Sequence, residues 1–332
     1  MSDYPEAVAE GWHPIASAGE FGRKPLARIL LGRPIVLFKS AGGPAAFLDR
    51  CPHRNMPLSA GRVRDGEIEC PYHGWRFAAD GRCTLTPGAD QPAAQRAEAL
   101  PIIERAGLVW TNLARDPAEF PALPSPIGDE RFDGFWWLMR PSRARLLDTI
   151  ENFLDPAHPH FLHAGIVRSG ATRRPVAVTV TIRGDYAEAT YIENTRASGL
   201  MPRLLEGLRS ASIGRFFPPS IGQIVFEGPS GPRLAVTVFF SPEAADRIRP
   251  IAHFATPKGL APAVLKKALL KLFNWPVVVQ DRAALRAQFD NVARFGAPHY
   301  ALGPLDFLLP AIRQLAAGEA PDAQDRHLTI NL

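Results

Sequence analysis

The segments CPHRNMP (51–57) and CPYHGWRF (70–77) decide how this 332-residue chain is interpreted. Each segment places one cysteine and one histidine a few residues apart, and sixteen residues separate the first pair from the second. The four candidate metal ligands are Cys51, His53, Cys70 and His73. Two thiolates and two imidazoles are enough for one metal centre, so the segments predict a metal site.

The distribution of ligand types separates two kinds of metal site. Zinc sites of the Cys2His2 type usually pair like ligands within each loop. Here each loop supplies one cysteine and one histidine, which suits a Rieske [2Fe–2S] cluster, where two cysteines bind one iron and two histidines the other. Pro52 and Pro71 fix φ at the loop tips, and Gly74 permits close backbone approach. We expect Tyr72 and Trp75 to shield the cluster; zinc remains the alternative.

Composition and charge indicate a soluble globular protein, with 46% hydrophobic and 21% charged residues. The net charge is +5, but lysine and arginine are scattered and no nucleic-acid motif appears, so we expect no nucleic-acid partner. Three cysteines argue against a disulfide framework, and Cys83 is expected to be a packed thiol. The acidic, polar start and the absence of a long apolar stretch predict no transmembrane segment and a cytoplasmic protein.

The chain reads as two regions, an all-β region over residues 1–118 and an α+β region over residues 119–332. The Pro-containing stretch Arg115–Asp133 provides the best boundary. Short β segments bounded by Gly and Pro, or alternating apolar and polar, predict strands. These are Pro34–Lys39, Ala45–Leu48, Glu67–Glu69, Leu108–Leu113, Val176–Ile182, Tyr186–Ile192, Gln223–Phe226, Leu234–Phe240 and Pro250–Phe254. The predicted helices are Pro262–Trp275, Pro276–Val292 and Leu305–Ala317.

A second candidate metal site lies in ENFLDPAHPHFLH (151–163), which holds three histidines and two carboxylates. An O2-activating mononuclear iron typically takes two histidines and one carboxylate on one face. On an ideal helix His160 and His163 share a face, whereas His158 and His163 do not. Because Pro156 and Pro159 make an undistorted helix improbable, geometry leaves both pairs open.

CPHRNMP and CPYHGWRF closely resemble the cluster loops of Rieske proteins, and nearly the whole chain resembles the α subunits of Rieske non-heme iron oxygenases. In that family the iron motif contains D-x2-H-x4-H, which Asp155, His158 and His163 match in order. The resemblance therefore implies His158 and His163 as iron ligands. It also implies a third ligand on a late helix, where Asp281 fits with Gln280 in place of the usual acid; Asp290 is the alternative.

The resemblance implies roles for three further residues. Asp155 would bridge a cluster histidine of one subunit and an iron-ligand histidine of the next, which orients both imidazoles and aids electron transfer. Asn152 matches a family position close to the iron. His160 would become a pocket residue or lie just behind the ligands.

The resemblance also implies fold and function. The fold would be α+β, an N-terminal all-β Rieske domain followed by a helix-grip-like catalytic domain whose antiparallel sheet is flanked by helices. The chain would be the terminal oxygenase, carrying a [2Fe–2S] cluster and a mononuclear Fe(II), in a homotrimer. A separate NAD(P)H-dependent reductase or ferredoxin would supply electrons, because no nucleotide- or flavin-binding motif is found. The alternative is a Rieske electron-transfer protein without oxygenase chemistry.

The length resembles that of the shorter members, mostly monooxygenases and O- or N-demethylases, rather than ring dioxygenases. We therefore expect hydroxylation or oxidative demethylation of an aromatic or other hydrophobic, even polycyclic, small molecule, as in aromatic compound catabolism. Five phenylalanines, three of them on the predicted strands Leu234–Phe240 and Pro250–Phe254, are equally well explained as pocket or as ordinary core. They are Phe216, Phe217, Phe239, Phe240 and Phe254.

Overall fold

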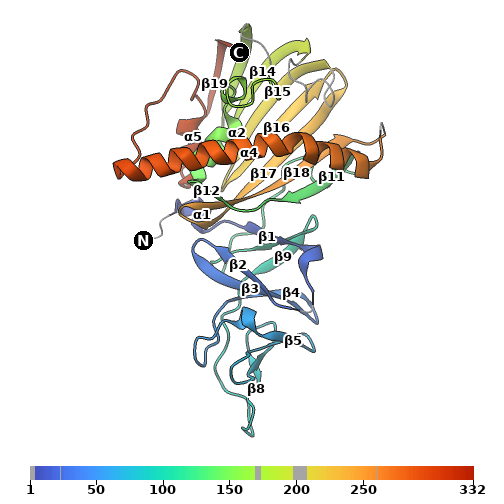
Figure 1. Cartoon of the computed structure of the whole chain (residues 1–332), viewed down its shortest axis with the longest axis vertical. Helices are drawn as coiled ribbons and strands as arrows, with labels where there is room; N and C mark the ends of the chain where they lie inside the picture. The colour runs from blue at the N-terminus through green and yellow to red at the C-terminus, as the bar shows by residue number, and fades with distance from the viewer. Residues whose placement is uncertain (1–3, 23, 169–172, 197–207, 260) are drawn as a thin grey trace. The chain divides into compact units, whose positions relative to one another are not determined.

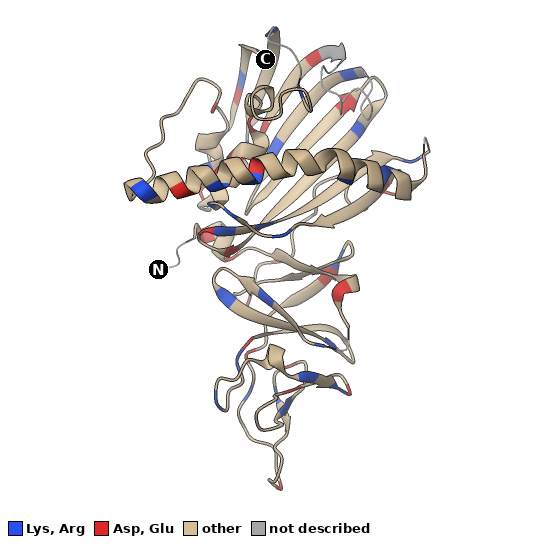
Figure 2. Ribbon diagram, in the orientation of Figure 1, with Lys and Arg blue, Asp and Glu red and all other residues tan. Residues whose placement is uncertain are grey.

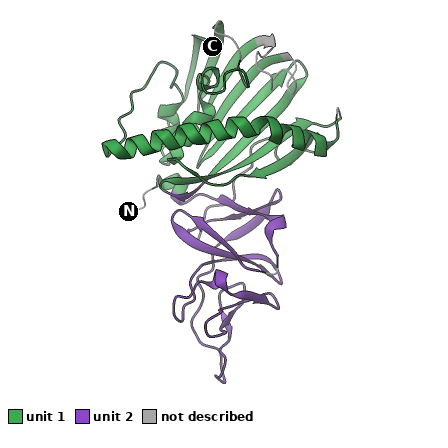
Figure 3. Cartoon of the chain, in the orientation of Figure 1, with its two compact units in different colours: residues 1–8, 122–240, 245–332 green, residues 9–121, 241–244 purple. Residues whose placement is uncertain are grey.

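The computed structural model describes the chain except for residues 1–3, 23, 169–172, 197–207 and 260. The chain divides into two compact units (Figure 3). The smaller unit comprises Ala9–Pro121 with Ser241–Ala244, and the larger unit comprises Met1–Val8, Ala122–Phe240 and Ala245–Leu332. The domain boundary between residues 118 and 119 remains a prediction. Lysine, arginine, aspartate and glutamate are interspersed along both units (Figure 2).

The smaller unit contains three small antiparallel sheets. The first has the order β1 (His13–Ser17), β10 (Leu108–Thr111), β9 (Ile102–Arg105). The second has the order β2 (Leu26–Leu30), β3 (Arg33–Ser40), β4 (Gly43–Leu48). The third has the order β5 (Arg62–Arg64), β6 (Glu67–Glu69), β7 (Arg76–Phe77), β8 (Cys83–Leu85). Two 3-10 turns complete the unit, η1 (Ala18–Glu20) and η2 (Leu58–Ala60). The short helix α1 (Glu6–Ala9) comes before β1.

The core that supports the two cysteine–histidine loops is aromatic and aliphatic. Phe38, Phe47 and Phe77 are each at most 1% exposed and pack with the three cysteines in one cluster. Cys83 is buried in this cluster, and its sulfur lies 3.4 Å from the Leu85 carbonyl oxygen. The prediction of a packed thiol is therefore confirmed.

The larger unit is built on a nine-stranded antiparallel sheet (Figure 1). The strand order is β11-β18-β17-β16-β15-β14-β13-β19, with β12 paired to β18. The bounds are β11 Phe132–Leu138, β12 Ser142–Arg143, β13 Pro175–Ile182, β14 Ala187–Arg196, β15 Leu208–Phe217, β16 Ile221–Gly228, β17 Gly231–Ala244, β18 Arg247–Pro257 and β19 Gln324–Asn331. Every predicted strand overlaps an observed one, but β11, β12, β15 and β19 of this sheet were not predicted.

Among the described residues, the larger unit contains the helices α2 (Leu146–Leu154), α4 (Ala263–Phe295) and α5 (Leu309–Ala316), with a 3-10 turn η3 (His158–His160) after α2. The long helix α4 crosses one face of the sheet (Figure 1). No described helix is long and apolar enough to cross a membrane.

The prediction of two separate helices, Pro262–Trp275 and Pro276–Val292, is wrong, because α4 continues through Pro276. An internal proline costs about 3 kcal/mol. Packing on both sides of Pro276 offsets that cost: Leu270 before it and Leu285 after it are buried. Trp275, directly before the proline, stacks on Trp137 of β11 with 6.2 Å between ring centroids.

Candidate metal centres and cavity

The two cysteine–histidine loops share one backbone conformation. In the first loop, the Cys51 amide donates to the Met56 carbonyl at 2.9 Å, and the Cys51 carbonyl accepts from the Asn55 amide at 2.9 Å. The second loop repeats both bonds at the same spacing from Cys70, at 2.8 and 3.1 Å. The backbone of each loop is therefore held in the same way around its cysteine, and each loop carries its histidine two or three residues later.

Each loop closes through a residue with positive φ. Asn55 has φ 58° and Gly74 has φ 70°, and both stand four residues after the loop cysteine. Glycine and asparagine are the residue types that enter the left-handed region at least cost. A Cβ at Gly74 would also lie 3.1 Å from Cγ of Pro87, so close packing reinforces the need for glycine there.

The side chains of the loops lie close together. The rings of His53 and His73 have centroids 4.6 Å apart, and Trp75 stacks on His53 at 4.5 Å with an interplanar angle of 4°. Cys51 is 1% exposed, and burial together with the neighbouring Cys70 thiol raises the pKa of Cys51 to about 11. A thiolate at this position needs a cation beside it. Two buried thiols and two adjacent imidazoles therefore fit a [2Fe–2S] cluster.

Tyr72 and Trp75 were both expected to shield this site. Trp75 covers His53, as its stacking shows. Tyr72 packs on the ring of His73, with centroids 3.9 Å apart, but is itself 63% exposed. The shielding of the loop tips is therefore partial on the tyrosine side.

In the larger unit, Asp155 organises the chain that follows α2. The helix ends at Leu154, and the Asp155 carboxylate accepts from the backbone amides of Ala157 at 2.8 Å and His158 at 3.0 Å. The His158 Nδ1 atom lies 3.1 Å from the Asp155 carbonyl oxygen. Because a carbonyl only accepts, Nδ1 carries the proton and Nε2 keeps its lone pair for a metal.

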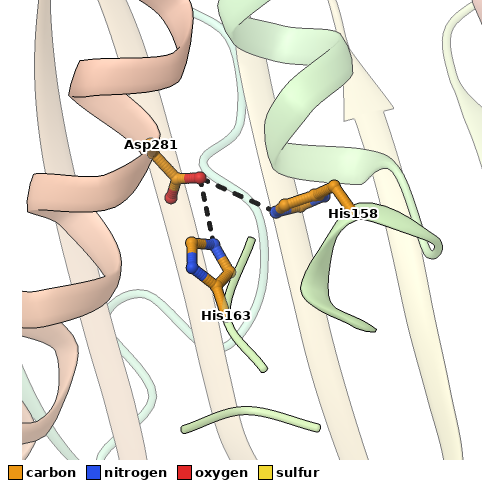
Figure 4. Close-up of side chains that lie close together, drawn as sticks. All are labelled: His158, His163 and Asp281. Atoms are coloured by element: carbon orange, nitrogen blue, oxygen red, sulfur yellow. Dashed lines mark hydrogen bonds and ion pairs between the residues drawn. The ribbon is translucent and has the colours of Figure 1, made fainter. Parts of the chain in front are cut away.

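His163 is oriented in the same way by the late helix. Its Nδ1 atom lies 2.8 Å from Oε1 of Gln280, so Nε2 again keeps the lone pair. Nε2 of His163 lies 3.0 Å from Oδ1 of Asp281, and Nε2 of His158 lies 3.7 Å from the same oxygen (Figure 4). Burial opposes protonation of His163, but the bonds to Asp281 and Gln280 raise its pKa overall.

The predicted triad of His158, His163 and Asp281 is thus brought together, with its ligand atoms within 4.8 Å of one another. Two imidazoles and one carboxylate form the donor set of the non-heme iron(II) facial triad, which leaves other coordination positions open. Asn152 donates from Nδ2 to Asp281 Oδ1 at 3.0 Å and thereby restrains the carboxylate. The donor set fits a mononuclear iron, and the assignment of these three ligands stays a prediction.

The two alternatives weighed from the sequence occupy other positions. Asp290 lies 3.1 Å from Arg143 of β12 and 3.6 Å from Arg286 of α4, and so forms ion pairs away from the other candidate ligands. His160 is not part of the group of converging ligand atoms, and its Nε2 atom is buried without a hydrogen-bond partner in the described chain. Its pKa is lowered by burial and by the positive charges of Arg168 and Arg173.

A cavity of about 180 Å³ lies beside the triad, and all three residues line it. Its apolar wall comes from α2, the sheet and α4, and includes Phe153, Ile224, Phe226, Leu234, Val236 and Val277. The sheet residues form two cross-strand pairs, Phe226 opposite Leu234 and Ile224 opposite Val236. One sheet face thus supplies an apolar surface next to the candidate iron ligands.

Two protein families match the two halves of this arrangement. Residues 11–104 match the Rieske [2Fe-2S] domain. Residues 142–313, about half of the chain, match the vanillate O-demethylase oxygenase C-terminal domain. The chain belongs to the Rieske oxygenase family. The Rieske match confirms the interpretation of the cysteine–histidine loops as a Rieske domain and argues against a zinc site.

Individual relatives agree with the family. Dicamba O-demethylase, oxygenase component, of Stenotrophomonas maltophilia is 29% identical over 60% of each chain. Methylxanthine N1-demethylase NdmA of Pseudomonas putida is 32% identical over 50% of each chain. This Rieske oxygenase spans about half the length of the curated relatives it matches.

Solved structures confirm the fold. Dicamba monooxygenase bound to dicamba superposes with a TM-score of 0.80 and 20% identity, covering 94% of this chain and 97% of that one. The P. putida NdmA structure with caffeine gives a TM-score of 0.80 at 21% identity, covering 97% of both chains. The predicted α+β class, a Rieske β domain followed by an antiparallel sheet with helices, is therefore correct.

The cavity of this Rieske oxygenase also has a charged wall that sequence reasoning missed. Glu193 is bound in bidentate fashion by Arg168, at 2.8 and 3.0 Å, and also by Arg209 at 3.3 Å. Ser212 donates to Glu193 at 2.7 Å, and Arg209 lies over the Phe226 ring at 4.2 Å. Burial works against ionisation, but the arginines lower the pKa of Glu193 to about 2. The carboxylate is therefore ionised and saturated with donors.

The phenylalanines considered as pocket candidates are core residues. None of the five lines the cavity beside the triad. Phe216, Phe239, Phe240 and Phe254 are each 3% exposed or less, and Phe217 is partly buried. Phe240 instead packs edge-to-face on Phe153, with centroids 5.8 Å apart, and so supports a cavity residue from behind. The phenylalanines that line the cavity are Phe153 and Phe226, which are not among the five candidates chosen from the sequence.

Proposed function

We propose that this Rieske oxygenase is the terminal oxygenase component of a multicomponent system. It would use O2 and electrons derived from NAD(P)H to hydroxylate or oxidatively demethylate an aromatic or other hydrophobic small molecule. Dihydroxylation is the less favoured outcome, because the demethylases named above are among its relatives. A dioxygenase subunit is also among the relatives, so the choice needs a product analysis.

The convergence of His158, His163 and Asp281 on the wall of an apolar cavity carries this proposal. A metal there would have open positions facing a space that accepts a small hydrophobic molecule. Bound iron(II) supplies O2 activation. The protein's own residues orient the ligands: the Asp155 carbonyl holds His158, Gln280 holds His163, and Asn152 holds Asp281. The apolar wall excludes water from the reacting face.

Electrons would enter through a cluster bound by Cys51, His53, Cys70 and His73, whose loops have the equivalent conformations described above. We propose a separate reductase, a ferredoxin, or both as the donor, and a homotrimer in which Asp155 connects the cluster of one subunit to the iron of the next. The Asp155 carboxylate is 31% exposed while it accepts from the amides of Ala157 and His158, so part of it remains accessible to a further hydrogen-bond donor. A cytoplasmic location remains a prediction.

Metal analysis with electron paramagnetic resonance tests the proposal. The anaerobically purified protein should contain about three irons per chain, two in the cluster and one at the triad. Reduction with dithionite should give the rhombic signal of a Rieske cluster. Asp281→Ala should lower the content to about two irons and abolish product formation while the cluster signal remains. Asp290→Ala, on the same helix, is the matched control and should keep about three.

The competing function is electron transfer without oxygenase chemistry. It predicts two irons in the wild-type protein and no effect of Asp281→Ala on the iron content. Zinc with no paramagnetic signal would contradict both functions.

A further inference from the structure

On the sheet side of the cavity, one described polar side chain has a role that neither the metal ligands nor the ion pairs explain. Tyr191 lies on β14, directly opposite Ser212 on β15, in the row of cross-strand neighbours that continues to Phe226 on β16. Glu193 stands two residues further along β14 and so projects from the same sheet face. Tyr191 and Glu193 both line the cavity.

The other polar groups on this part of the wall are already bonded to one another. Both carboxylate oxygens of Glu193 accept from Arg168, and Ser212 donates to the same carboxylate. Both guanidinium groups, those of Arg168 and Arg209, are engaged by it. These residues form a structural network that needs no ligand.

The Tyr191 hydroxyl, unlike the groups bound to Glu193, has no hydrogen-bond partner in the described chain. Tyr191 is 5% exposed, and in the described chain its hydroxyl is one of five buried side-chain polar atoms without a hydrogen-bond partner. The other four belong to His160, Arg233, His253 and Thr256, none of which lines the cavity. A buried hydroxyl without a partner costs free energy, so its retention on a cavity wall points to a ligand that satisfies it.

The hydroxyl can act there as a hydrogen-bond donor. Burial, together with the negative charges of Asp155 and Glu193, raises the pKa of Tyr191, so the phenol keeps its proton at neutral pH. The Glu193 charge is paired with Arg168 and Arg209, so an anionic group beside the phenol would face the Asp155 carboxylate while both guanidinium groups are already engaged. A neutral acceptor, such as an ether or carbonyl oxygen, is compatible with this environment.

We propose that the Tyr191 hydroxyl donates a hydrogen bond to a neutral acceptor oxygen, an aryl ether or a carbonyl, of the aromatic substrate. The proposal rests on the proposed oxygenase function and names the substrate class for the same cavity. Tyr191 is a specificity residue: it places the acceptor against β14 while the aromatic ring lies on the apolar wall, with Phe153 and Phe226. The substrate is thereby oriented relative to the triad.

Binding calorimetry on the iron-loaded protein tests the proposal with small probes of similar size. The probes are 4-methylanisole and 4-methylacetophenone, which carry a neutral acceptor, 4-ethyltoluene, which carries none, and 4-methylbenzoate, which is anionic. We expect the first two to bind about tenfold more tightly than 4-ethyltoluene, the value of one well-made hydrogen bond, and 4-methylbenzoate to bind more weakly.

Tyr191→Phe should abolish the preference for the acceptor probes and leave the affinity for 4-ethyltoluene unchanged. Its melting temperature should stay equal or rise, because the substitution removes an unsatisfied buried hydroxyl. Tyr186→Phe is the matched control: Tyr186 packs on Phe217 and does not line the cavity, so that variant should keep the preference.

A small neighbouring cavity of about 20 Å³, which Tyr191 also lines, offers the competing explanation of a bound water. A fall in the melting temperature of Tyr191→Phe with no change in probe affinity would favour that water and overturn the proposal. Three other results would also overturn the proposal. All four probes could bind equally, 4-methylbenzoate could bind most tightly, or neither acceptor probe could bind. Failure of the oxygenase function is distinguishable, because it would appear as missing triad iron or missing product while probe binding is measured independently.

Discussion

The Nδ1 atom of His163 donates a hydrogen bond to Oε1 of Gln280 at 2.8 Å. Gln280 directly precedes Asp281, whose carboxylate lies 3.0 Å from Nε2 of the same ring. Two consecutive residues of α4 therefore bind the two nitrogens of one imidazole. Gln280 selects the tautomer with a free Nε2 lone pair, and Asp281 stands where that lone pair and its own oxygen can share a metal.

Gln280→Leu should weaken iron binding at the triad by roughly 10- to 100-fold, the usual cost of removing a group that orients a metal-bound histidine. Gln280→Glu should retain the iron, because a carboxylate also accepts from Nδ1. Titration of the iron-depleted protein with Fe(II) measures the affinity. The Rieske absorbance is an internal control and should not change. Equal Fe(II) affinity of the leucine variant and the wild type would exclude this role for Gln280.

The cluster loops make a separate prediction about Asn55, which has φ 58°. Asn55→Gly should assemble the cluster normally, since glycine adopts positive φ without steric cost. Asn55→Val should destabilise the loop by more than about 1 kcal/mol and lower cluster occupancy, because a β-branched residue is strained there. Visible absorbance and the paramagnetic signal per chain report the occupancy. A fully loaded valine variant would contradict the argument from backbone conformation.

The Rieske loops could be predicted from the sequence because the metal ligands and the residues that shape the backbone around them are close together in the chain. Proline, asparagine and glycine occupy the loop positions whose backbone φ angles suit those residue types. The loop conformation can therefore be inferred without knowledge of distant contacts. The triad was harder. His158, His160 and His163 were compatible with two pairs, because Pro156 and Pro159 remove the helical frame on which spacing arguments rest. Only the resemblance to the Rieske oxygenase iron motif favoured His158 over His160 as an iron ligand.

Tertiary packing explains the features that sequence reasoning missed. Pro276 signals a helix end, but Leu270 and Leu285 are buried on either side of it and the helix continues. The sequence pattern of β14 could have indicated Glu193 and Tyr191 as cavity residues. Both are polar and alternate with the residues of the opposite face, and they share the face on which Ala189 is buried. The partners of Glu193, Arg168 and Arg209, are 25 and 16 residues away in the sequence, so no local pattern predicts this ion-pair network.

Two glycines of the sheet predict opposite responses to alanine. A Cβ at Gly222 on β16 would lie 2.7 Å from Cδ1 of Phe153, whereas a Cβ at Gly214 on β15 would meet only Leu154, at 3.7 Å. Gly222→Ala should displace the Phe153 ring from the cavity wall and cost about 1–3 kcal/mol of overpacking. Gly214→Ala should be close to neutral. Thermal unfolding compares the stabilities; similar melting temperatures of the two variants would contradict this packing.

Glu193 makes a prediction about stability and pH. Its pKa falls from 4.5 to about 2 on folding, despite its burial, because Arg168 and Arg209 favour the ionised form. A carboxylate with a lowered folded-state pKa stabilises the protein fully above its unfolded pKa, and the contribution is lost as the pH falls from about 4.5 towards 2. Each pKa unit corresponds to about 1.4 kcal/mol, so the ionised group contributes about 3 kcal/mol at neutral pH.

Glu193→Gln should therefore lower the free energy of unfolding by about 3 kcal/mol at pH 7, or more if the arginines are left unpaired. Glu188→Gln is the matched control on the same strand; its partner Arg215 is partly exposed, so a loss below about 1 kcal/mol is expected. Urea unfolding of the three proteins at pH 7, 5 and 3.5 measures the differences. The Glu193→Gln difference should be equal at pH 7 and 5 and smaller at pH 3.5. A difference that already shrinks between pH 7 and 5 would show that the Glu193 carboxylate is not held ionised by its arginines.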